Sequence, residues 1–462
     1  MTDTPWMNDA CSLVDAFRKK ERSPKEELQA TLNAIDKSTL NAFCYLEAEK
    51  ALERADKIDT SLPFGGLPIA VKELDPVKGW PASKASVPLK DEIGKYDSTV
   101  VERLRENGAN LFGQTNASEF GGVNCTHTKL HGSTLNPWNK ERTPGGSSGG
   151  AASAVSGGLC TLSTAGDGGG SIRIPSGFCG LVGLKTTFGR IPMGPYLEPE
   201  PFTVTMGCVS RSVRDTARWL DVCNGQDIHD PFSLPKVVGW EQRLGSYGLA
   251  GKKVAIAPTL GCATVLPAIQ EMIHEHGQLL AKDCGLEIVD IPVNFPEGSM
   301  EWAIGNSVGL VNTLGDKYPD CEQDLTLEIG FALRVALQMY DLKMAARVES
   351  FRTSVFEAFA QVFEQVDFVI ASTNPDVAFS ASGPLPSVVG DISCGMGNNG
   401  ALTIPCNISG NPGINIPVGN LDGLPVGMQV ISRRHEEALL LDLALSVERE
   451  RPWPLVAPGA PF

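Results

Sequence analysis

Three observations on the sequence predict an α/β protein that folds as one large domain. Segments with helical signals alternate with short apolar segments along most of the chain, as in proteins that layer helices on a sheet. The composition is that of a folded chain, because 42% of the residues are hydrophobic and 20% are charged. The 462 residues allow two or three ordinary domains, but no linker is polar or long enough to mark a boundary.

The first half of the chain begins with a clear helix signal. Ser23 is a preferred capping residue, and Pro24 suits the first helical turn. With Glu27 at the positive end of the helix dipole, these residues predict a helix that runs to about Ile35. Similar signals predict a helix over 47–58, a strand over 69–71, a helix over 99–106 and a strand over 110–112.

The second half predicts longer elements after a stretch that resembles a loop, over 190–235. The alternation resumes with a strand over 254–257, a helix over 269–283 and a strand over 286–289. Residues 331–365 are mostly helical, 366–370 form a strand, 414–431 form two strands joined at Asp422-Gly423, and 435–449 form a closing helix. We therefore expect a single domain over 1–462, with its core in 60–220 and 366–462 and a helical insertion at about 230–365.

Net charge and cysteine use limit the partners and the compartment. The chain carries 54 acidic and 39 basic residues, a net charge of −15, with no run of Lys or Arg that could form a basic patch. Such a chain repels phosphate backbones and anionic lipid head groups, so we expect no nucleic-acid or membrane partner. The 12 cysteines form no C-x-x-C pair, which argues against zinc ribbons and thioredoxin-type sites. With no signal-peptide core and no membrane-length apolar run, the expected location is cytoplasmic.

Glycine is concentrated in one segment. Residues 145–180 contain 12 of the 49 glycines, where average usage predicts about two or three. Gly145 to Gly149 matches the G-x-S-x-G nucleophile elbow, but residues 140–144 before it are no strand, so a Ser-His-Asp hydrolase is not supported. Phosphate binding is disfavoured, because no Lys follows at the Walker spacing and Asp167 would lie beside the phosphates.

What remains is a set of one lysine and two serines. Lys72 ends a short apolar strand, where a lysine either extends its amine to solvent or is buried as a functional amine. Ser147 and Ser171 lie in glycine-flanked turns, where a single serine is usually only a turn residue. A functional role therefore depends on the combination. The one Ser-x-x-Lys pair, at 233–236, contains a proline that spoils the helical turn such pairs need.

At these residues the sequence resembles the amidase signature family of serine hydrolases, and in particular its stand-alone bacterial-type amidases. The matching motifs are 66–72, 115–120, 145–150, 168–175, 178–185 and 423–429, which together span nearly the whole chain. The resemblance implies a central mixed, twisted β-sheet covered by helices on both faces. It also implies a Ser-cisSer-Lys triad with a cis peptide bond between Gly146 and Ser147.

The resemblance assigns roles by position. It makes Ser171 the nucleophile, Ser147 the bridging serine and Lys72 the base, with 24 residues between the two serines and 75 from Lys72 to Ser147. The backbone N–H groups of Gly168, Gly169, Gly170 and Ser171 would form the oxyanion hole. Gly121, Ser148, Asp167 and Arg173 would contact the substrate. No cofactor and no metal is required.

The chemistry of such a triad depends on a neutral lysine. Free Lys has a pKa of about 10.4, and burial lowers that value because it disfavours the ammonium. Neutral Lys72 would accept the proton of Ser147 as Ser147 accepts that of Ser171, whose oxygen attacks the carbonyl before water releases the acyl group. We therefore expect activity to rise from neutral to alkaline pH.

Three positions depart from the family pattern. Glu73 stands where Asp commonly follows the lysine, Gly168 where Thr precedes the two glycines, and Thr187 where Pro follows the Lys-Thr pair at 185–186. None of these changes removes a catalytic atom. The sequence leaves open how Glu73 alters the surroundings of Lys72.

The leading hypothesis is a hydrolase of small amides and anilides, acting as a monomer or homodimer, whose machinery also suits carbamates (urethanes) and esters. The alternatives are the glutamine-hydrolysing component of a tRNA amidotransferase and a non-catalytic binding protein with the same fold. By family analogy, 298–345 and 374–386 would shape the substrate pocket. Candidates for its apolar wall are Phe331, Met339, Tyr340 and Phe379.

Overall fold

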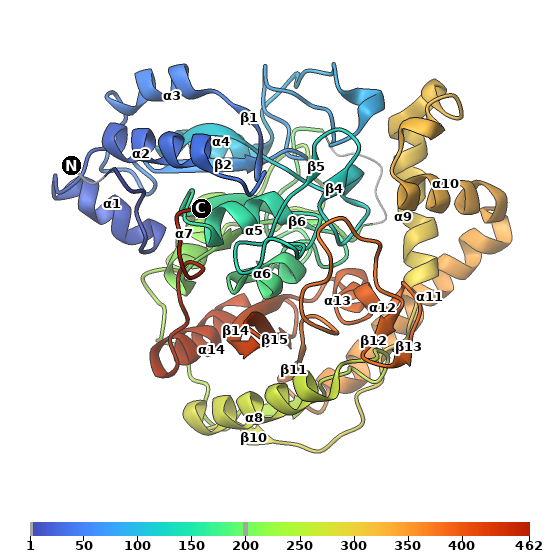
Figure 1. The fold of residues 1–462 in the computed structure, drawn as a ribbon. Helices are drawn as coiled ribbons and strands as arrows, with labels where there is room; N and C mark the ends of the chain where they lie inside the picture. Colours follow the sequence, from blue (N-terminus) through green and yellow to red (C-terminus); the bar gives the residue numbers. More distant parts are fainter. Residues whose placement is uncertain (1–2, 197–201) are drawn as a thin grey trace.

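The computed structural model describes residues 3–196 and 202–462, and its centre is a mixed β-sheet (Figure 1). In order across the sheet, the described strands are β1 (Phe43–Leu46), β3 (Asn110–Thr115), β2 (Pro68–Lys72), β6 (Leu162–Asp167), β8 (Thr205–Ser210), β7 (Val182–Lys185), β14 (Gly413–Leu421), β15 (Leu424–Ser432), β11 (Phe368–Ser372), β9 (Lys253–Ile256) and β10 (Glu287–Ile288). β2 is parallel to β3 and β6, and β9 is parallel to β11 and β10, whereas the other neighbours are antiparallel. Two short pairs lie outside this sheet: β4 (His127–Thr128) with β5 (Gly132–Ser133), and β12 (Val388–Val389) with β13 (Ile392–Ser393).

Helices cover both faces of the sheet. They are α1 (Ala10–Arg18), α2 (Pro24–Lys37), α3 (Ala48–Ala55), α4 (Thr99–Glu106), α5 (Gly149–Ser156), α6 (Arg173–Cys179), α7 (Val213–Cys223), α8 (Pro267–Cys284), α9 (Ser299–Leu314), α10 (Leu327–Met339), α11 (Leu342–Phe363), α12 (Asn398–Ala401), α13 (Ile404–Ser409) and α14 (Glu437–Glu450). Alternate residues of β2 show the two layers. Ile69 and Val71 pack in the large core cluster with α7 and α14, whereas Ala70 packs in a second cluster with α5, because successive strand residues point to opposite faces.

Most of the expected elements are present, with ends shifted by a few residues. α2 begins with a capping box, in which Ser23 Oγ accepts the Glu26 N–H and the Glu26 carboxylate accepts the Ser23 N–H. The predicted turn between β14 and β15 is also present. Its residues Asp422 and Gly423 have φ values of 52° and 79°, as in the tight turns that match the twist of a hairpin.

The expected loop over 190–235 is wrong at β8 and α7, whereas the other described residues of this stretch form no helix or strand. β8 pairs with β6 and β7 near the middle of the sheet, and α7 follows with Ser212 as its cap. Five of the six residues of β8 are buried, so this central strand has no alternation of polar and apolar residues to reveal it. Residues 197–201 of the expected loop lie outside the described residues.

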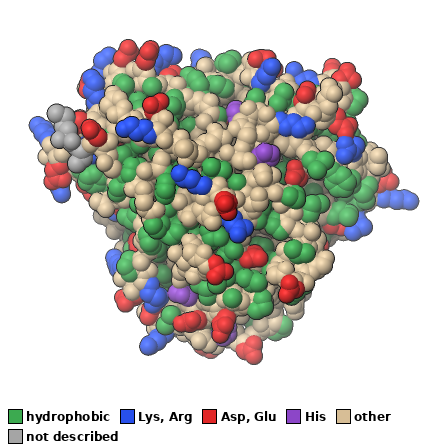
Figure 2. Space-filling model, viewed as in Figure 1, with side chains coloured by type: hydrophobic (Ala, Val, Ile, Leu, Met, Phe, Trp, Pro, Cys, Tyr) green, Lys and Arg blue, Asp and Glu red, His purple; other side chains and the backbone are tan. Residues whose placement is uncertain are grey.

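The segment over 230–365 is more than a helical insertion. Its strands β9 and β10 extend one end of the sheet, while α9, α10 and α11 lie together on one flank, in yellow and orange (Figure 1). Hydrophobic side chains gather on that flank in the space-filling view (Figure 2), and Leu327, Phe331 and Leu337 are exposed there. In the described part of the chain, no helix has the length and hydropathy to span a bilayer.

Candidate active site

A cavity of about 280 Å³ lies where β2 and β6 end. Lys72 is the last residue of β2, and the loop that begins at Gly168 directly follows β6. Because these strands are parallel neighbours, their carboxyl ends meet at one edge of the sheet. Ser147 and Ser171 line the same cavity. The fold therefore brings together the three residues singled out in the sequence.

The Lys72 side chain is buried and points at Ser147. Its Nζ donates to Ser147 Oγ over 2.8 Å and lies 3.5 Å from the carbonyl oxygen of Gly166. Burial lowers the pKa of Lys72 to about 8, and the negative charges of Asp75 and Asp167 limit this decrease. At pH 7 about a tenth of such an amine is neutral, against about one in three thousand for a lysine of unperturbed pKa.

Ser147 is placed by a turn that leaves no room for larger residues. The peptide bond between Gly146 and Ser147 is cis. A Cβ atom on Gly146 would lie 2.5 Å from the carbonyl oxygen of Val123, so glycine is required by the close approach of two backbone segments. Helix α5 begins two residues after Ser147.

The four backbone amides expected in the oxyanion hole differ from one another. The Gly170 N–H already donates to Asp167 Oδ1 over 2.8 Å, so the expectation that it stabilises an oxyanion is corrected. Within the described residues, the amides of Gly168, Gly169 and Ser171 have no acceptor. In the same residues no hydrogen bond joins the two serine hydroxyls; such contacts often tighten only when substrate is bound.

Asp167 stabilises the turn at 168–171 through hydrogen bonds to its backbone. Besides Gly170, its carboxylate accepts the N–H groups of Ile172 and Arg173, and it forms an ion pair with the Arg173 guanidinium at 2.9 Å. Both side chains are fully buried. Burial alone would raise the pKa of Asp167, but the Arg173 charge holds it well below its usual range.

The carboxyl-terminal part of the chain completes this support. Arg173 also donates to Gln429 Oε1 and Asn407 Oδ1, both over 2.6 Å. Asn407 Nδ2 donates to the Asp167 carboxylate and backbone, both over 2.8 Å, and Thr403 Oγ1 donates to the Gly169 carbonyl over 2.6 Å. The turn is therefore fixed by groups more than 200 residues away in the chain.

Of the four residues expected to contact substrate, only Gly121 lines the cavity. Asp167 and Arg173 lie beneath the turn, as described above, and Ser148 is buried with its Oγ 3.4 Å from the Gly166 carbonyl oxygen. These three are placed to support the site rather than to touch a ligand in the cavity. In the sequence these residues are close to the two serines, but closeness in sequence does not distinguish a residue that lines the cavity from one that is buried behind the lining.

The apolar wall is also made by other residues than expected. Trp302, Leu310 and Ile329 line the cavity from α9 and α10. Trp302 Nε1 donates to the Gly168 carbonyl over 3.0 Å, and a Cβ on Gly169 would lie 2.6 Å from the Trp302 ring.

The expected wall residues lie elsewhere. Phe331, Met339 and Tyr340 are exposed, and Phe379 packs edge-on against Phe178. The expectation that 374–386 shapes the cavity is likewise not met, because none of its residues lines it.

Comparisons with known proteins agree with this arrangement. A family model for amidases matches residues 26–441. The glutamyl-tRNA(Gln) amidotransferase of Persephonella marina has an A-type subunit that is 30% identical, over 95% of this chain and 96% of its own length. The same subunit of Cyanothece sp. is 32% identical, over 94% and 96%.

Solved structures show the same likeness. A bacterial aryl acylamidase of the amidase signature family superposes with a TM-score of 0.90 at 26% identity, covering 97% of both chains. 6-Aminohexanoate cyclic dimer hydrolase gives 0.87 at 26% identity, covering 98% of this chain and 99% of its own. The corresponding amidotransferase subunit from Thermotoga maritima shares the fold, with a TM-score of 0.75 at 24% identity over 94% of each chain. This chain belongs to the amidase signature family of C–N hydrolases.

Proposed function

We propose that this protein is a stand-alone serine amidase that hydrolyses small amides and anilides with an apolar group beside the scissile bond. The observation that carries the proposal is the 2.8 Å hydrogen bond from the buried Lys72 amine to Ser147, in the same cavity as Ser171. Carbamates and esters present the same carbonyl, so we include them as secondary substrates.

The reaction follows from the placement of these groups. Neutral Lys72 accepts the proton of Ser147, and Ser147 accepts that of Ser171, whose Oγ attacks the carbonyl carbon. The amides of Gly169 and Ser171 donate to the oxygen that becomes negative, and loss of one such donor elsewhere costs about 10²–10³ in rate. The departing amine receives a proton back through Ser147, and water then releases the acyl group from Ser171.

The walls of the cavity support an apolar substrate. Trp302 packs directly on the proposed oxyanion turn, and Leu310 and Ile329 continue this surface. An aryl or alkyl group bound there would be removed from water, which stabilises binding by about 25 cal/mol per Å² of apolar surface. The overlay with an aryl acylamidase, at a TM-score of 0.90, agrees with this substrate class.

A second candidate has its own support. Several relatives at 30–32% identity over most of the chain are the same subunit of glutamyl-tRNA(Gln) amidotransferases, so glutamine hydrolysis within a complex is the competing function. Free glutamine carries an ammonium and a carboxylate, whereas the large side chains that the described helices α9 and α10 contribute to the cavity are the apolar Trp302, Leu310 and Ile329, with the smaller polar Asn306, Ser307 and Thr313 beside them and no charged residue from either helix. This wall favours the first candidate.

A substrate panel separates the candidates. The purified single chain is assayed with an anilide, an aliphatic amide, an ester, a carbamate and glutamine. Hydrolysis of the anilide by the single chain supports the proposal. Turnover of glutamine alone, and only after addition of a partner protein, contradicts it.

Covalent labelling tests whether the fold is catalytic at all. A fluorophosphonate is expected to modify Ser171, as read by mass spectrometry of the labelled peptide. Ser171→Ala should lose labelling and activity, whereas Ser153→Ala, on α5 and away from the cavity, should keep both. An unlabelled Ser171 in folded protein would indicate a non-catalytic binding protein.

A further inference from the structure

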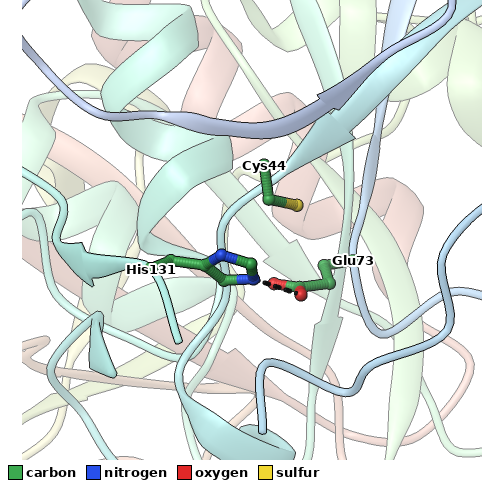
Figure 3. A group of neighbouring side chains, drawn as sticks. All are labelled: Cys44, Glu73 and His131. Carbon is green, nitrogen blue, oxygen red and sulfur yellow. Dashed lines mark hydrogen bonds and ion pairs between the residues drawn. The ribbon is translucent and has the colours of Figure 1, made fainter. Parts of the chain in front are cut away.

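A second group of reactive side chains lies behind the catalytic strand. Cys44 comes from β1, Glu73 directly follows β2, and His131 lies in the turn between β4 and β5. One ligand atom of each residue lies within 4.8 Å of the other two. Figure 3 shows the three side chains converging, with the His131 ring directed at the Glu73 carboxylate and the Cys44 thiol beside it. None of them lines the active-site cavity.

The position of Glu73 explains why this group is separate from the triad. Lys72 and Glu73 are consecutive, and consecutive residues of an extended chain point to opposite sides. Lys72 therefore reaches Ser147, while the Glu73 carboxylate meets His131 Nε2 at 2.7 Å and accepts the Ser83 hydroxyl. The Glu73 side chain is 1% exposed and that of His131 is 21% exposed. The Glu73 carboxylate is thus buried, and the His131 imidazole that contacts it is partly exposed to solvent.

We propose that Cys44, Glu73 and His131 bind one zinc-class divalent ion. Thiolate, imidazole and carboxylate are the three side-chain ligand types that Zn²⁺ prefers. A buried carboxylate also requires a charged partner, which the ion would supply more strongly than an imidazole.

The distances suit such an ion after small shifts. Zn–ligand bonds of about 2.0–2.3 Å at tetrahedral angles place the ligand atoms about 3.4–3.6 Å apart. The His131–Glu73 contact of 2.7 Å must therefore open by less than an ångström, and the separations that involve Cys44 are at most 4.8 Å, so they need only a small adjustment. Binding displaces the thiol proton of Cys44 to solvent and leaves His131 with its proton on Nδ1. The fourth ligand of the proposed ion would be water, since the three side chains fill three of the four tetrahedral positions.

Titration of untagged, chelator-stripped protein with Zn²⁺ against a competing chromophoric chelator tests this site. We expect one ion per chain, and at least tenfold weaker binding in Cys44→Ser and in His131→Gln. Matched controls are Cys394→Ser, a cysteine elsewhere in the chain, and His127→Gln, in the same hairpin but bonded to Ser133. Both controls should bind Zn²⁺ like the unmodified protein. Equal affinity in all four variants would overturn the proposal.

Cobalt substitution gives a spectroscopic readout that begins with the unmodified protein. Co²⁺ bound to the unmodified protein should show a thiolate-to-cobalt charge-transfer band, and this band should be absent from Cys44→Ser and present in Cys394→Ser. Zn²⁺ should also raise the melting temperature of the unmodified protein through mass action, but not that of Cys44→Ser. A cobalt complex of the unmodified protein without the band would refute the site.

Discussion

Removing the charge of Asp167 should damage stability and catalysis together. In Asp167→Asn, the Arg173 guanidinium stays fully buried but loses its anionic partner. Breaking a buried ion pair at one partner costs about 3–5 kcal/mol. The unfolding entropy of about 2.1 cal/mol/K per residue gives about 1 kcal/mol/K for 462 residues. We therefore expect the melting temperature to fall by about 3–5 °C.

The catalytic effect has a separate cause. The carboxylate accepts the Gly170, Ile172 and Arg173 amides, and an amide side chain cannot accept all three in the same way. The turn that carries the proposed oxyanion donors then shifts, so kcat should fall by about 10²–10³. Anilide hydrolysis at saturating substrate measures this loss, and KM should change less than kcat.

Two further measurements distinguish the loss of the Asp167 charge from nonspecific destabilisation of the fold. The double variant Asp167→Asn/Arg173→Met removes both charges, and it should melt higher than Asp167→Asn alone. The folded pKa of Asp167 lies below its unfolded value, so the stabilisation is present above pH of about 4 and is lost as pH falls below it. The melting difference between Asp167→Asn and the unmodified protein should be constant from about pH 5 to 8. If Asp167→Asn lowered the melting temperature by less than 1 °C and left kcat unchanged, the reasoning would be refuted.

Three other predictions concern the site itself. kcat/KM should rise about tenfold per pH unit and level off near pH 8, because Lys72 acts as the base only when its amine is neutral. A rate maximum below pH 5 would contradict the role of Lys72 as the base. Gly169→Ala should lose at least tenfold in kcat, since its Cβ would lie 2.6 Å from the Trp302 ring, and an unchanged kcat would show that the ring yields. Trp302→Ala should widen the cavity and improve kcat/KM for bulky anilides relative to acetanilide, and an unaltered ratio would place the substrate elsewhere.

Lys72, Ser147 and Ser171 could be singled out because each lies in a local sequence pattern, whereas three of the four expected substrate contacts and the expected apolar wall do not line the cavity. The glycine-rich segment contains Ser147 and Ser171, and Lys72 ends an apolar strand, but the roles proposed for them come from the resemblance to the amidase signature family. The alternation of elements likewise gave the α/β class, since helices and exposed hairpins keep their own periodicity.

Long-range contacts could not be predicted in the same way. Asn407 and Gln429 reach Arg173 from more than 230 positions away, and no pattern at either position indicates the partner. Trp302 is one of seven tryptophans, and only the path of α9 makes it a wall of the cavity. The central strand β8 was missed because burial on both faces erases its period.

The structure shows why Glu73, which stands where the family commonly has Asp, does not disturb Lys72. Its carboxylate turns toward His131 and Ser83, away from the cavity. Among the carboxylates of the described chain, those of Asp75 and Asp167 are the ones that oppose deprotonation of Lys72. The longer side chain therefore serves a separate polar cluster.

The distant anchors of the turn at 168–171 govern when the site can exist during synthesis. Thr403 leaves the ribosome 232 residues after Ser171, which takes about 12–46 s at about 5–20 residues per second. Throughout that interval the nascent chain carries its serines and lysine without the groups that aim the turn. Under the proposed function, we therefore expect fragments that end before Thr403 to lack the hydrogen bond that holds the turn beside Ser171 and to be inactive.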